Sequence, residues 1–490
     1  MENLKTDVVI VGSGGAGLAA ALTAAEGGAK VIAFEEKRAH GGISNLAREI
    51  FAVESKMQRE NNIPFTKDDA FKIFMEHTHW RADARLVRAY IDKTASTIKW
   101  LQQQGVEFFP ITPFYQFPEM QIAAHYPKPP TGSSRAGATA AITKALRDKA
   151  KEKGVEIRLS TPVKKIVKDG ERVTGVITED QAGETIQVNA KAVIIASGGY
   201  VSNKEMVKKY GGFELGRDLL ITHTFELTGD GIKMAWEVGA DSDGMYPQFE
   251  YYVPAPKAWA LKTTLRIVYA QPYFWVNQQG ERFFDEGIAG NGVYTANAIA
   301  RQKNKCAYLI FDENTKKYME EEGVDIVPAP LSERKKDVDL DGLIKAARGL
   351  GNEHIFVADS LEELSNKIGV KPDVLQKTVN EYNKFCEKGH DDLFAKNPKY
   401  LKPVKQPKFY AFRIMLCGYA TIGGIKINER TEVLDKEDEV IPGLYAAGDC
   451  ANGALSYDRS LSLVLRGAPL GFALNSGRIA GENALKYIAK

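Results

Sequence analysis

The sequence contains little cysteine. Its four cysteines, Cys306, Cys386, Cys417 and Cys450, are widely separated among 490 residues. No CxxC or CxxCH motif occurs, and no cysteines and histidines have the spacing of metal ligands. These absences exclude covalent haem attachment, iron–sulfur clusters and zinc ribbons. We therefore expect no metal site, and we expect four buried thiols in a reducing cytoplasm.

The sequence also lacks any long block of charge of one sign. It has 65 basic and 63 acidic residues, a net charge of +2, so we expect neither nucleic acid nor an anionic membrane surface as a partner. No apolar run reaches the roughly 18 residues that a transmembrane helix needs. The N-terminal MENLKT leads directly into DVVIVG, without the features of a secretory signal. The expected location is cytoplasmic.

The length and the ordinary composition, 44% hydrophobic and 26% charged residues, predict two or three domains with a large core. Residues 241–407 differ from the rest, because they hold aromatic clusters, most of the later prolines and a Lys/Glu-rich helical part. We interpret them as an inserted second domain. Residues 1–240 and 408–490, rich in glycine turns and small-residue helices, are expected to form the first domain.

Residues 6–37 have the pattern of a βαβ unit: an apolar strand, a glycine turn, a small-residue helix and a second strand. Continuous apolar strands between helices predict an α/β fold with a parallel sheet covered on both faces. Helical periodicity covers roughly 84–104 and again 136–153, and alternating strands follow at 156–190.

The first glycine turn has the spacing of a dinucleotide-binding loop. Gly12 permits the tight turn, Gly14 lets backbone N–H groups approach a pyrophosphate, and Gly17 lets helix and strand pack closely. The start of the helix contributes its positive dipole end. Glu35 ends the second strand, where an acid that binds a ribose hydroxyl is expected. This unit alone does not separate FAD from NAD.

Two further glycine turns favour FAD. Residues 196–199, AlaSerGlyGly, follow an apolar strand, and residues 443–449, GLYAAGD, end in an acid. Asp449 is suited to accept hydrogen bonds from a hydroxylated chain such as the ribityl group of a flavin. Three such turns fit an extended FAD better than a single nicotinamide cofactor.

The ordered motifs of the chain resemble a known family. They are GSGGAG (12–17), GGIS (41–44), ASGGYVSNKEMVKKY (196–210), TGDGIKMAWEVGA (228–240), NQQGERFFDE (277–286), TIGGIKIN (421–428), GLYAAGD (443–449) and GRIAG (477–481). In order and spacing, over essentially the whole chain, this set resembles the FAD-binding fumarate reductase/succinate dehydrogenase flavoprotein superfamily. The resemblance implies a Rossmann-like FAD domain of the glutathione-reductase type, interrupted by an α+β capping domain, with substrate held between cap and flavin.

The resemblance also implies which residues hold FAD. They are Gly12, Gly14, Gly15, Ala16, Gly17 and Glu35 for the ADP half, Gly41, Gly42 and Ser44 beside the pyrophosphate and flavin, Val163 near adenine, Ser197, Gly198, Gly424 and Gly448 close to the cofactor, and Asp449 at the ribityl chain.

The family's dicarboxylate pattern is not kept. Fumarate reductases bind a dicarboxylate with His and Arg side chains and protonate carbon through an Arg. Here Ala420 stands where those enzymes carry a His, and the segment after FFDE, GIAGNGVYTANAI, contains no Arg. The cap segment YPQFEYY offers Glu250 in place of a second His. Arg459 and Arg466 lie near the family's last substrate Arg without matching its register, so the sequence argues against a dicarboxylate substrate.

The 3-ketosteroid Δ1-dehydrogenases of the same superfamily give a closer comparison. Their pattern, a Tyr four residues before a Gly whose amide also binds a ketone oxygen, matches Tyr419 and Gly423. A phenol and an amide aimed at one oxygen would form an oxyanion hole, and a second phenol, Tyr294, would exchange the α-proton. A third tyrosine could be Tyr115 or Tyr126.

We therefore expect an FAD-dependent oxidoreductase that moves a hydride between flavin N5 and the β-carbon of an α,β-unsaturated carbonyl compound, cyclic or bearing an aromatic ring. The direction is open, so the enzyme is an ene-reductase or a desaturase, and electrons would pass to or from a separate carrier. Two alternatives remain: an enzyme for an unsaturated carboxylate, similar to fumarate or urocanate reductases, or an electron-transfer flavoprotein subunit.

Overall fold

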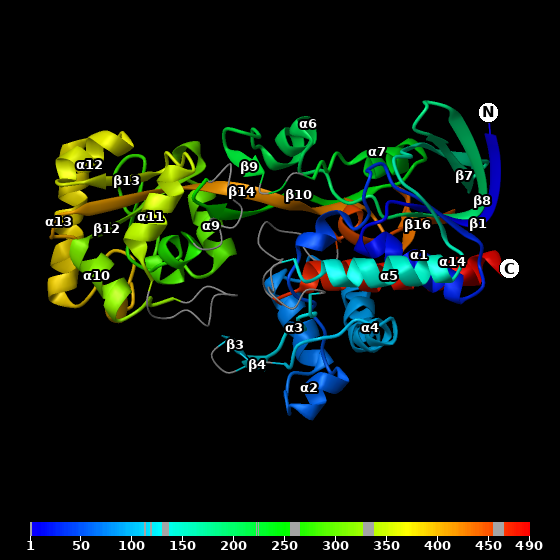
Figure 1. Cartoon of the computed structure of the whole chain (residues 1–490), viewed down its shortest axis with the longest axis horizontal. Helices are drawn as coiled ribbons and strands as arrows, with labels where there is room; N and C mark the ends of the chain where they lie inside the picture. The colour runs from blue at the N-terminus through cyan, green and yellow to red at the C-terminus, as the bar shows by residue number, and fades with distance from the viewer. Residues whose placement is uncertain are drawn as a thin grey trace. The chain divides into compact units, whose positions relative to one another are not determined.

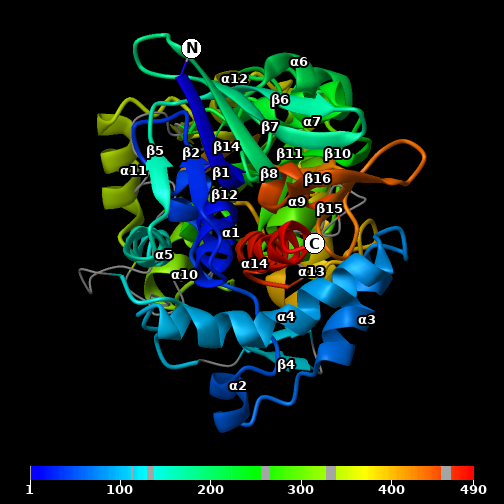
Figure 2. The ribbon, with the colours of Figure 1, turned by 90° about the vertical axis from the view of Figure 1, so that its right-hand side faces the viewer.

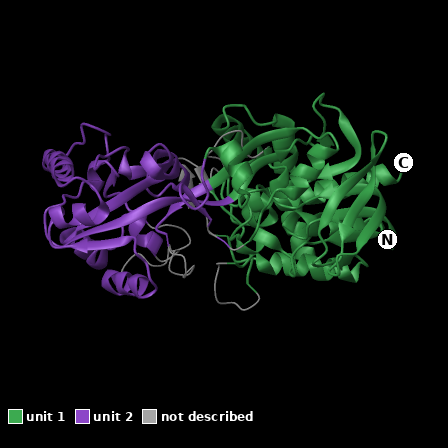
Figure 3. Ribbon diagram, turned by 90° about the horizontal axis from the view of Figure 1, so that it is seen from above, with its two compact units in different colours: residues 1–212, 224–248, 420–490 green, residues 213–223, 249–419 purple. Residues whose placement is uncertain are grey.

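The computed structural model describes residues 2–111, 114–117, 120–129, 137–221, 223, 225–254, 265–326, 338–453 and 465–490. The chain forms two compact units (Figure 3). Unit 1 comprises residues 1–212, 224–248 and 420–490, and unit 2 comprises residues 213–223 and 249–419. The sequence-based boundaries lie at 240/241 and 407/408, so the structure places the changes 8 and 12 residues later and adds the short segment 213–223 to unit 2.

Unit 1 contains most of the N-terminal half of the chain and its C-terminal helix (Figure 1). Its elements are β1 (Glu2–Val11), α1 (Gly15–Glu26), β2 (Val31–Phe34), η1 (Gly42–Leu46), α2 (Lys56–Glu60), α3 (Lys67–His77), α4 (Ala84–Gln103), β3 (Phe114–Phe117), β4 (Met120–Ile122), α5 (Ala140–Glu152), β5 (Glu156–Arg158), β6 (Val163–Asp169), β7 (Arg172–Glu179), β8 (Thr185–Ile195), α6 (Lys204–Met206), η2 (Val207–Gly211), α7 (Asp230–Glu237), β15 (Glu432–Leu434), β16 (Val440–Ala446), η6 (Gly448–Cys450) and α14 (Ala468–Ile488).

The main sheet of unit 1 has the strand order β15-β16-β8-β1-β2-β5, with β6 and β7 added beside β8. The strand β1 pairs in parallel with β2 and with β8, and β16 pairs in parallel with β8. The strand β7 pairs antiparallel with β6 on one side and with β8 on the other. The parallel βαβ unit predicted from residues 6–37 is confirmed, and the fold is α/β with mixed sheets.

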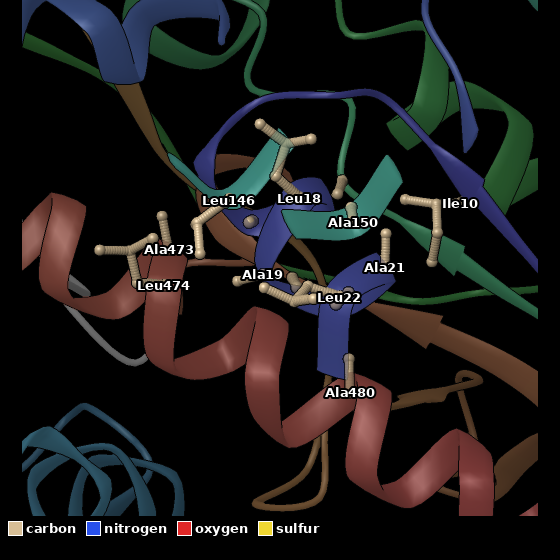
Figure 4. Packing of buried hydrophobic residues seen from close by; sticks show 14 of the residues in the cluster. Ile10, Leu18, Ala19, Ala21, Leu22, Leu146, Ala150, Ala473, Leu474 and Ala480 are labelled. Carbon is tan, nitrogen blue, oxygen red and sulfur yellow. The ribbon is translucent and has the colours of Figure 1, made fainter. Parts of the chain in front are cut away.

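The helices α1, α5 and α14 pack together beside this sheet (Figures 2 and 4). Small residues permit the close approach of α1 and α14: a side chain at Gly477 would overlap the carbonyl of Ala16, and one at Gly481 would crowd the carbonyl of Ala20. Leu146 of α5 is fully buried in the same cluster. The predicted helices near 84–104 and 136–153 correspond to α4 and α5.

Unit 2 is built on a second mixed sheet. Two strands, β10 (Ser242–Tyr252) and β14 (Phe409–Ile425), have residues in both units. The other elements are β9 (Leu219–Ile221), β11 (Phe274–Asn277), η3 (Glu286–Ile288), α9 (Gly292–Ala300), η4 (Lys303–Lys305), β12 (Cys306–Asp312), α10 (Glu313–Glu321), α11 (Leu340–Gly349), β13 (Ile355–Ala358), α12 (Leu361–Ile368), α13 (Pro372–Lys388) and η5 (Pro398–Tyr400). The strand order is β10-β14-β12-β11, and β13 and β9 also pair with β14.

Alternation along β14 builds the core of unit 2. Ala411 and Met415 join a buried cluster with residues of α12 and α13, whereas Tyr410 and Phe412 on the other face stack against Phe311. Successive side chains of a strand point to opposite faces of the sheet, so this one strand fills both sides of it.

Within the described ranges, no group of three or more His, Cys, Asp or Glu residues could hold a metal ion, and no helix is long and apolar enough to span a membrane. All four cysteines are free, and three of them are buried. The expectation of four buried thiols is wrong for Cys386, which is only partly buried in α13.

Candidate cofactor site and substrate-site residues

The first glycine turn of unit 1 is held by its own packing. A side chain at Gly12, where φ is +101°, would strike the carbonyl of Ala196, and one at Gly17 would overlap the carbonyl of Gly12. At Gly14 the nearest atom to such a side chain would be Gly41 O, 3.9 Å away. Two of the three glycines are therefore required by the fold, and the third leaves open space at the start of α1.

Residues 41–44 lie against that open space. Gly14 and Gly41 form a parallel bridge, and the Gly41 amide donates to Ser13 O at 2.8 Å. The hydroxyl of Ser44 accepts from the Gly15 amide at 3.1 Å. At Gly42, where φ is +49°, the only atom near an added Cβ would be Gly14 Cα, at 4.0 Å. The N-cap residue of α1, Gly14, offers no side-chain acceptor, so the first-turn amides that follow Gly15 can donate to an anion.

The carboxylate of Glu35 closes the same turn. One of its oxygens accepts from the amide and the hydroxyl of Ser13 at 2.8 and 2.9 Å, and the other accepts from the Lys37 amide at 3.0 Å. A carboxylate has about four lone-pair sites, so one remains for a hydroxyl. The Thr161 amide donates to Glu35 O at 2.9 Å, which brings the start of β6, and with it Val163, to this side of the turn.

The third predicted turn packs on the first. At Gly448, where φ is +73°, an added Cβ would lie 2.8 Å from Ala16 Cβ. The Gly448 amide donates to Ser476 Oγ at 3.0 Å. Burial raises the pKa of the neighbouring Asp449 to about 6, and a hydrogen bond with Asn452 lowers it in part. A partly buried carboxyl without a strong cationic partner gains from hydroxyl donors.

The second predicted turn meets residues 421–424. The amide of Tyr200 donates to Thr421 Oγ1 at 3.2 Å. A side chain at Gly424 would overlap the carbonyl of Cys450, and Gly424 forms a bridge with Ala451. Beside them, the buried Ser197 hydroxyl has no hydrogen-bond partner among the residues that the structure describes.

These contacts fit an extended dinucleotide. Segments that are far apart in the sequence, 12–17, 41–44, 196–200, 421–424 and 448–451, meet within unit 1. Together they offer an uncapped helix start for phosphates, two carboxyl groups for hydroxyls, and an unpartnered buried hydroxyl. The donor set therefore matches FAD, whose pyrophosphate and ribityl chain need these kinds of group.

One of the two predicted oxygen donors, the Gly423 amide, already has an acceptor. The amide of Gly423 donates to Asn452 Oδ1 at 2.5 Å, and Asn452 Nδ2 donates to Thr421 O at 3.0 Å. The Gly423 amide is therefore engaged within unit 1. Tyr419, the last residue of unit 2, is partly buried, and its carbonyl bonds to the His223 ring at 2.9 Å.

The predicted arginines do not form a dicarboxylate clamp in the described part of the chain. Arg459 lies outside the described residues. Arg466 Nε lies 3.8 Å from Glu49 Oε1, so it has a structural acid as a partner. Tyr294 is 46% exposed in the first turn of α9. Tyr115, one of the two candidates for a third tyrosine, lies outside the residues whose side chains are described.

Glu250 is buried and paired. Its carboxylate accepts from Arg266 Nη1 at 3.0 Å and from the Tyr252 hydroxyl at 3.1 Å. Sequence reasoning missed Arg266, which precedes the fully buried Tyr269 by three residues. The spacing R-I-V-Y places both on one helical face, a signal that the surrounding aromatic residues obscured.

Comparisons with known proteins identify the family of the chain. The family model described as FAD binding domain matches residues 7–460. Vinyl phenol reductase of Lactiplantibacillus plantarum is 35% identical over 491 residues, covering 98% of this chain and 96% of the relative.

Two solved structures extend the comparison. A flavocytochrome c3 fumarate reductase in an open conformation is 27% identical with a TM-score of 0.75, covering 99% of this chain and 79% of that one. A 3-ketosteroid Δ1-dehydrogenase from Sterolibacterium denitrificans, 21% identical with a TM-score of 0.77 and covering 98% and 99% of the two chains, shares the fold. The chain belongs to the FAD-binding fumarate reductase/succinate dehydrogenase flavoprotein superfamily and is an FAD-dependent oxidoreductase.

Proposed function

We propose that this enzyme reduces a carbon–carbon double bond conjugated to an oxygen-bearing group, as in an enone or a vinyl phenol. The observation that carries the proposal is the match along nearly the full length of both chains to a reductase named for a vinyl phenol. The buried aromatic cluster of unit 2 agrees with it, since Tyr251 packs edge-on against both Tyr269 and Trp275. Aromatic residues are common in sites for flat, mostly apolar ligands.

Unit 1 is proposed as the Rossmann-like FAD domain of the glutathione-reductase type and unit 2 as the α+β capping domain that contributes substrate contacts. In unit 1 the open space at Gly14 and Gly42 would admit the pyrophosphate. Glu35 would accept from the adenosine ribose with its remaining lone pair, and Asp449 from the ribityl hydroxyls. The other predicted residues, Gly41, Ser44, Val163, Gly198 and Gly424, would border the cofactor through backbone or packing contacts.

The reaction adds a hydride to one carbon of the double bond and a proton to the other. FAD, when bound and reduced, supplies the hydride. In an enone the substrate oxygen becomes an enolate when hydride reaches the β-carbon. In a vinyl phenol the phenolic oxygen releases its proton to water as the terminal carbon gains one. The benzylic carbon then accepts the hydride, and the phenolate oxygen regains a proton from water. In both cases charge changes at the oxygen, so donors held at that oxygen stabilise the transition state.

The tyrosines keep the roles that their positions suggest. Tyr419 is proposed to donate to the substrate oxygen, and Tyr294 to exchange the proton at carbon. The exposed side chain of Tyr294 can regain its proton from water. The Gly423 amide could assist only after release from Asn452. Electrons are proposed to come from a separate carrier.

Steady-state assay of the FAD-loaded enzyme with reduced methyl viologen tests the proposal. The panel contains 4-vinylphenol, 4-phenyl-3-buten-2-one, urocanate and fumarate. We expect turnover of one of the first two and little of the carboxylates. Turnover of fumarate at a rate equal to the best oxygen-conjugated substrate would contradict the proposal and favour the carboxylate alternative. No turnover of any of the four would favour an electron-transfer role.

A further inference from the structure

Unit 2 contains a buried polar group whose donors exceed its acceptors. Glu250 and Tyr252, two residues apart on β10, lie on one face of that strand, and Arg266 and Tyr269 lie three residues apart on the helical segment 265–269. We call these four residues the Arg266 cluster. Arg266 donates to Glu250 through Nη1 at 3.0 Å, and Tyr252 donates to the same carboxylate oxygen at 3.1 Å.

Two donors of the cluster are left over. The Nε–H of Arg266 and the hydroxyl of Tyr269 are buried and have no hydrogen-bond partner among the residues that the structure describes. Tyr269 is 0% exposed. Buried donors are nearly always satisfied in native proteins, because an unmet donor costs free energy. Two of them on one helical face indicate a missing acceptor.

The cluster is also built for close approach. The first residue of α9 is Gly292, and a side chain there would lie 3.2 Å from Arg266 Nη2 and 3.4 Å from the Glu250 carboxyl carbon. The glycine therefore lets the helix start approach the Arg266–Glu250 pair. The same helix carries Tyr294, which the proposed function assigns to proton exchange at carbon.

We propose that Arg266 Nε and Tyr269 Oη bind the oxygen of the substrate, a neutral phenol or ketone rather than a carboxylate. This inference rests on the proposed function, because the oxygen belongs to the conjugated substrate named there. The sequence predicted that the Gly423 amide would donate to the substrate oxygen beside Tyr419. Because that amide is engaged, the inference assigns this role to the side chains of Arg266 and Tyr269 in unit 2.

Charge balance selects the neutral oxygen. Arg266 and Glu250 already neutralise each other at 3.0 Å. A substrate carboxylate would add a second buried negative charge to a single cation, which is costly in a low-dielectric site. A phenol or ketone oxygen brings only partial charge, and it gains most from the two donors when negative charge develops during the reaction.

Protonation supports a donor role for both groups. Burial raises the pKa of Tyr269 well above its ordinary value. Burial alone would lower the pKa of Arg266, but the Glu250 charge outweighs it and the pKa is raised. Both side chains therefore keep their protons at neutral pH and act as hydrogen-bond donors to an oxygen.

Calorimetric titration of the FAD-loaded protein tests the inference with 4-ethylphenol and its methyl ether, 4-ethylanisole, which keeps the shape and loses the hydroxyl. We expect the wild-type protein to bind the phenol about tenfold or more tightly than the ether, as one or two buried hydrogen bonds predict. Tyr269→Phe should weaken phenol binding about tenfold, and Arg266→Gln about 10–100-fold. Neither variant should change ether binding by more than about twofold.

Tyr273→Phe is the matched control. Tyr273 is a buried tyrosine of the same unit whose hydroxyl also has no hydrogen-bond partner among the described residues, but it lies beside Asp325 and outside the Arg266 cluster. Its variant should therefore bind both probes as the wild type does. Tyr269→Phe removes only an unpartnered hydroxyl and is expected to fold even where Arg266→Gln does not. Equal phenol affinity in Tyr269→Phe and the wild type would overturn the inference, as would a wild type that binds phenol and ether equally.

Two outcomes separate this inference from the proposed function. In the first outcome the assay panel shows turnover, Tyr419→Phe removes the preference for phenol over ether, and Tyr269→Phe keeps it. The proposed function then stands and the inference is overturned. If no panel compound is turned over but Tyr269→Phe still removes the preference, the proposed reaction fails while the oxygen-binding site is supported.

Discussion

Two buried charged groups of unit 2 differ in how completely their hydrogen bonds are met. One is the Arg266 cluster, in which two donors have no partner among the residues that the structure describes. The other, which we call the ion network, consists of Arg282, Glu286, Asp391 and Lys396, all buried. Two cations face two anions in the ion network, and Arg282 donates two hydrogen bonds to each carboxylate at 2.6–3.1 Å.

The remaining donor of the ion network is met as well. Lys396 Nζ donates to Tyr273 O at 2.8 Å and to the Tyr382 hydroxyl at 3.0 Å. Burial alone would raise the pKa of Asp391, but the hydrogen bonds and charge of Arg282 lower it overall. A fully met network leaves nothing for a ligand, so its function is to hold the segment around residues 282–286 in place. The comparison teaches that two unmet donors on one helical face, rather than buried charge, distinguish the Arg266 cluster as the candidate ligand site.

Breaking the ion network is expected to have the largest effect on stability. Arg282→Met leaves two buried carboxylates facing a single cation, Lys396, which should lower the free energy of unfolding by about 3–5 kcal/mol. Chemical denaturation measures this change in the free energy of unfolding. The control is Lys388→Met, which breaks an exposed pair with Asp392 and should cost less than about 1 kcal/mol. Equal losses in the two variants would contradict the assignment of a structural role to the network.

Two glycines of unit 1 allow a similar comparison, because the space beside Gly17 is filled by other atoms and the space beside Gly14 is open. Gly17→Ala would force a side chain into the Gly12 carbonyl and should cost about 1–3 kcal/mol by overpacking. Gly14→Ala meets only open space, so thermal stability without FAD should hold while FAD affinity falls about tenfold or more. Thermal melts and FAD titration of the stripped protein measure both. FAD affinity unchanged in Gly14→Ala would show that the open space is not where the cofactor binds.

Two tyrosine substitutions in unit 2, one in each group, should have opposite effects on stability and on turnover. Tyr382→Phe removes an acceptor of Lys396 and should lower the free energy of unfolding by about 1 kcal/mol, with turnover unchanged. Tyr269→Phe removes a hydroxyl that the described residues leave unpartnered, so stability should stay level while turnover falls about tenfold. Lower turnover in Tyr382→Phe together with lower stability in Tyr269→Phe would reverse the roles given to the two groups.

The smallest expected effect is the pH dependence of Asp449. Its folded pKa is raised to about 6 by burial, so the folded protein holds the proton more tightly than the unfolded chain. Stability without FAD should therefore decline as pH rises from about 4 to about 6, by less than about 1 kcal/mol because this carboxyl is partly exposed. Thermal melts of wild type and Asp449→Asn across that range test it: the variant should lose the slope. An identical slope in both would assign the decline to another group.

The βαβ unit and the FAD-dependent class of enzyme were predictable from the sequence. The glycine spacings reflect local backbone requirements, such as the tight packing of Gly17 on Gly12, and their order along the chain carries the family resemblance. The domain boundaries were not located as the units have them, because β10 and β14 continue without interruption from one unit into the other. Composition changes gradually along such strands.

The substrate-site residues were harder to predict. Tyr419 and Gly423 have a suggestive spacing, but a hydrogen bond from Gly423 to Asn452, 29 residues away, decides whether that amide is available. Glu250 stood out only as an acid in an aromatic stretch, and its pairing with Arg266, 16 residues later, depends on how a strand meets a helix.

The sequence by itself determined the cofactor and the enzyme class, because phosphate-binding turns require particular residues at fixed spacing whatever surrounds them. Only the tertiary structure decided which polar groups remain open to a ligand. Whether a donor is met depends on partners from other segments: Asn452 for Gly423, and Glu250 for Arg266. The physical reason is that hydrogen-bond satisfaction is a property of packed neighbours, which no local pattern of residues records.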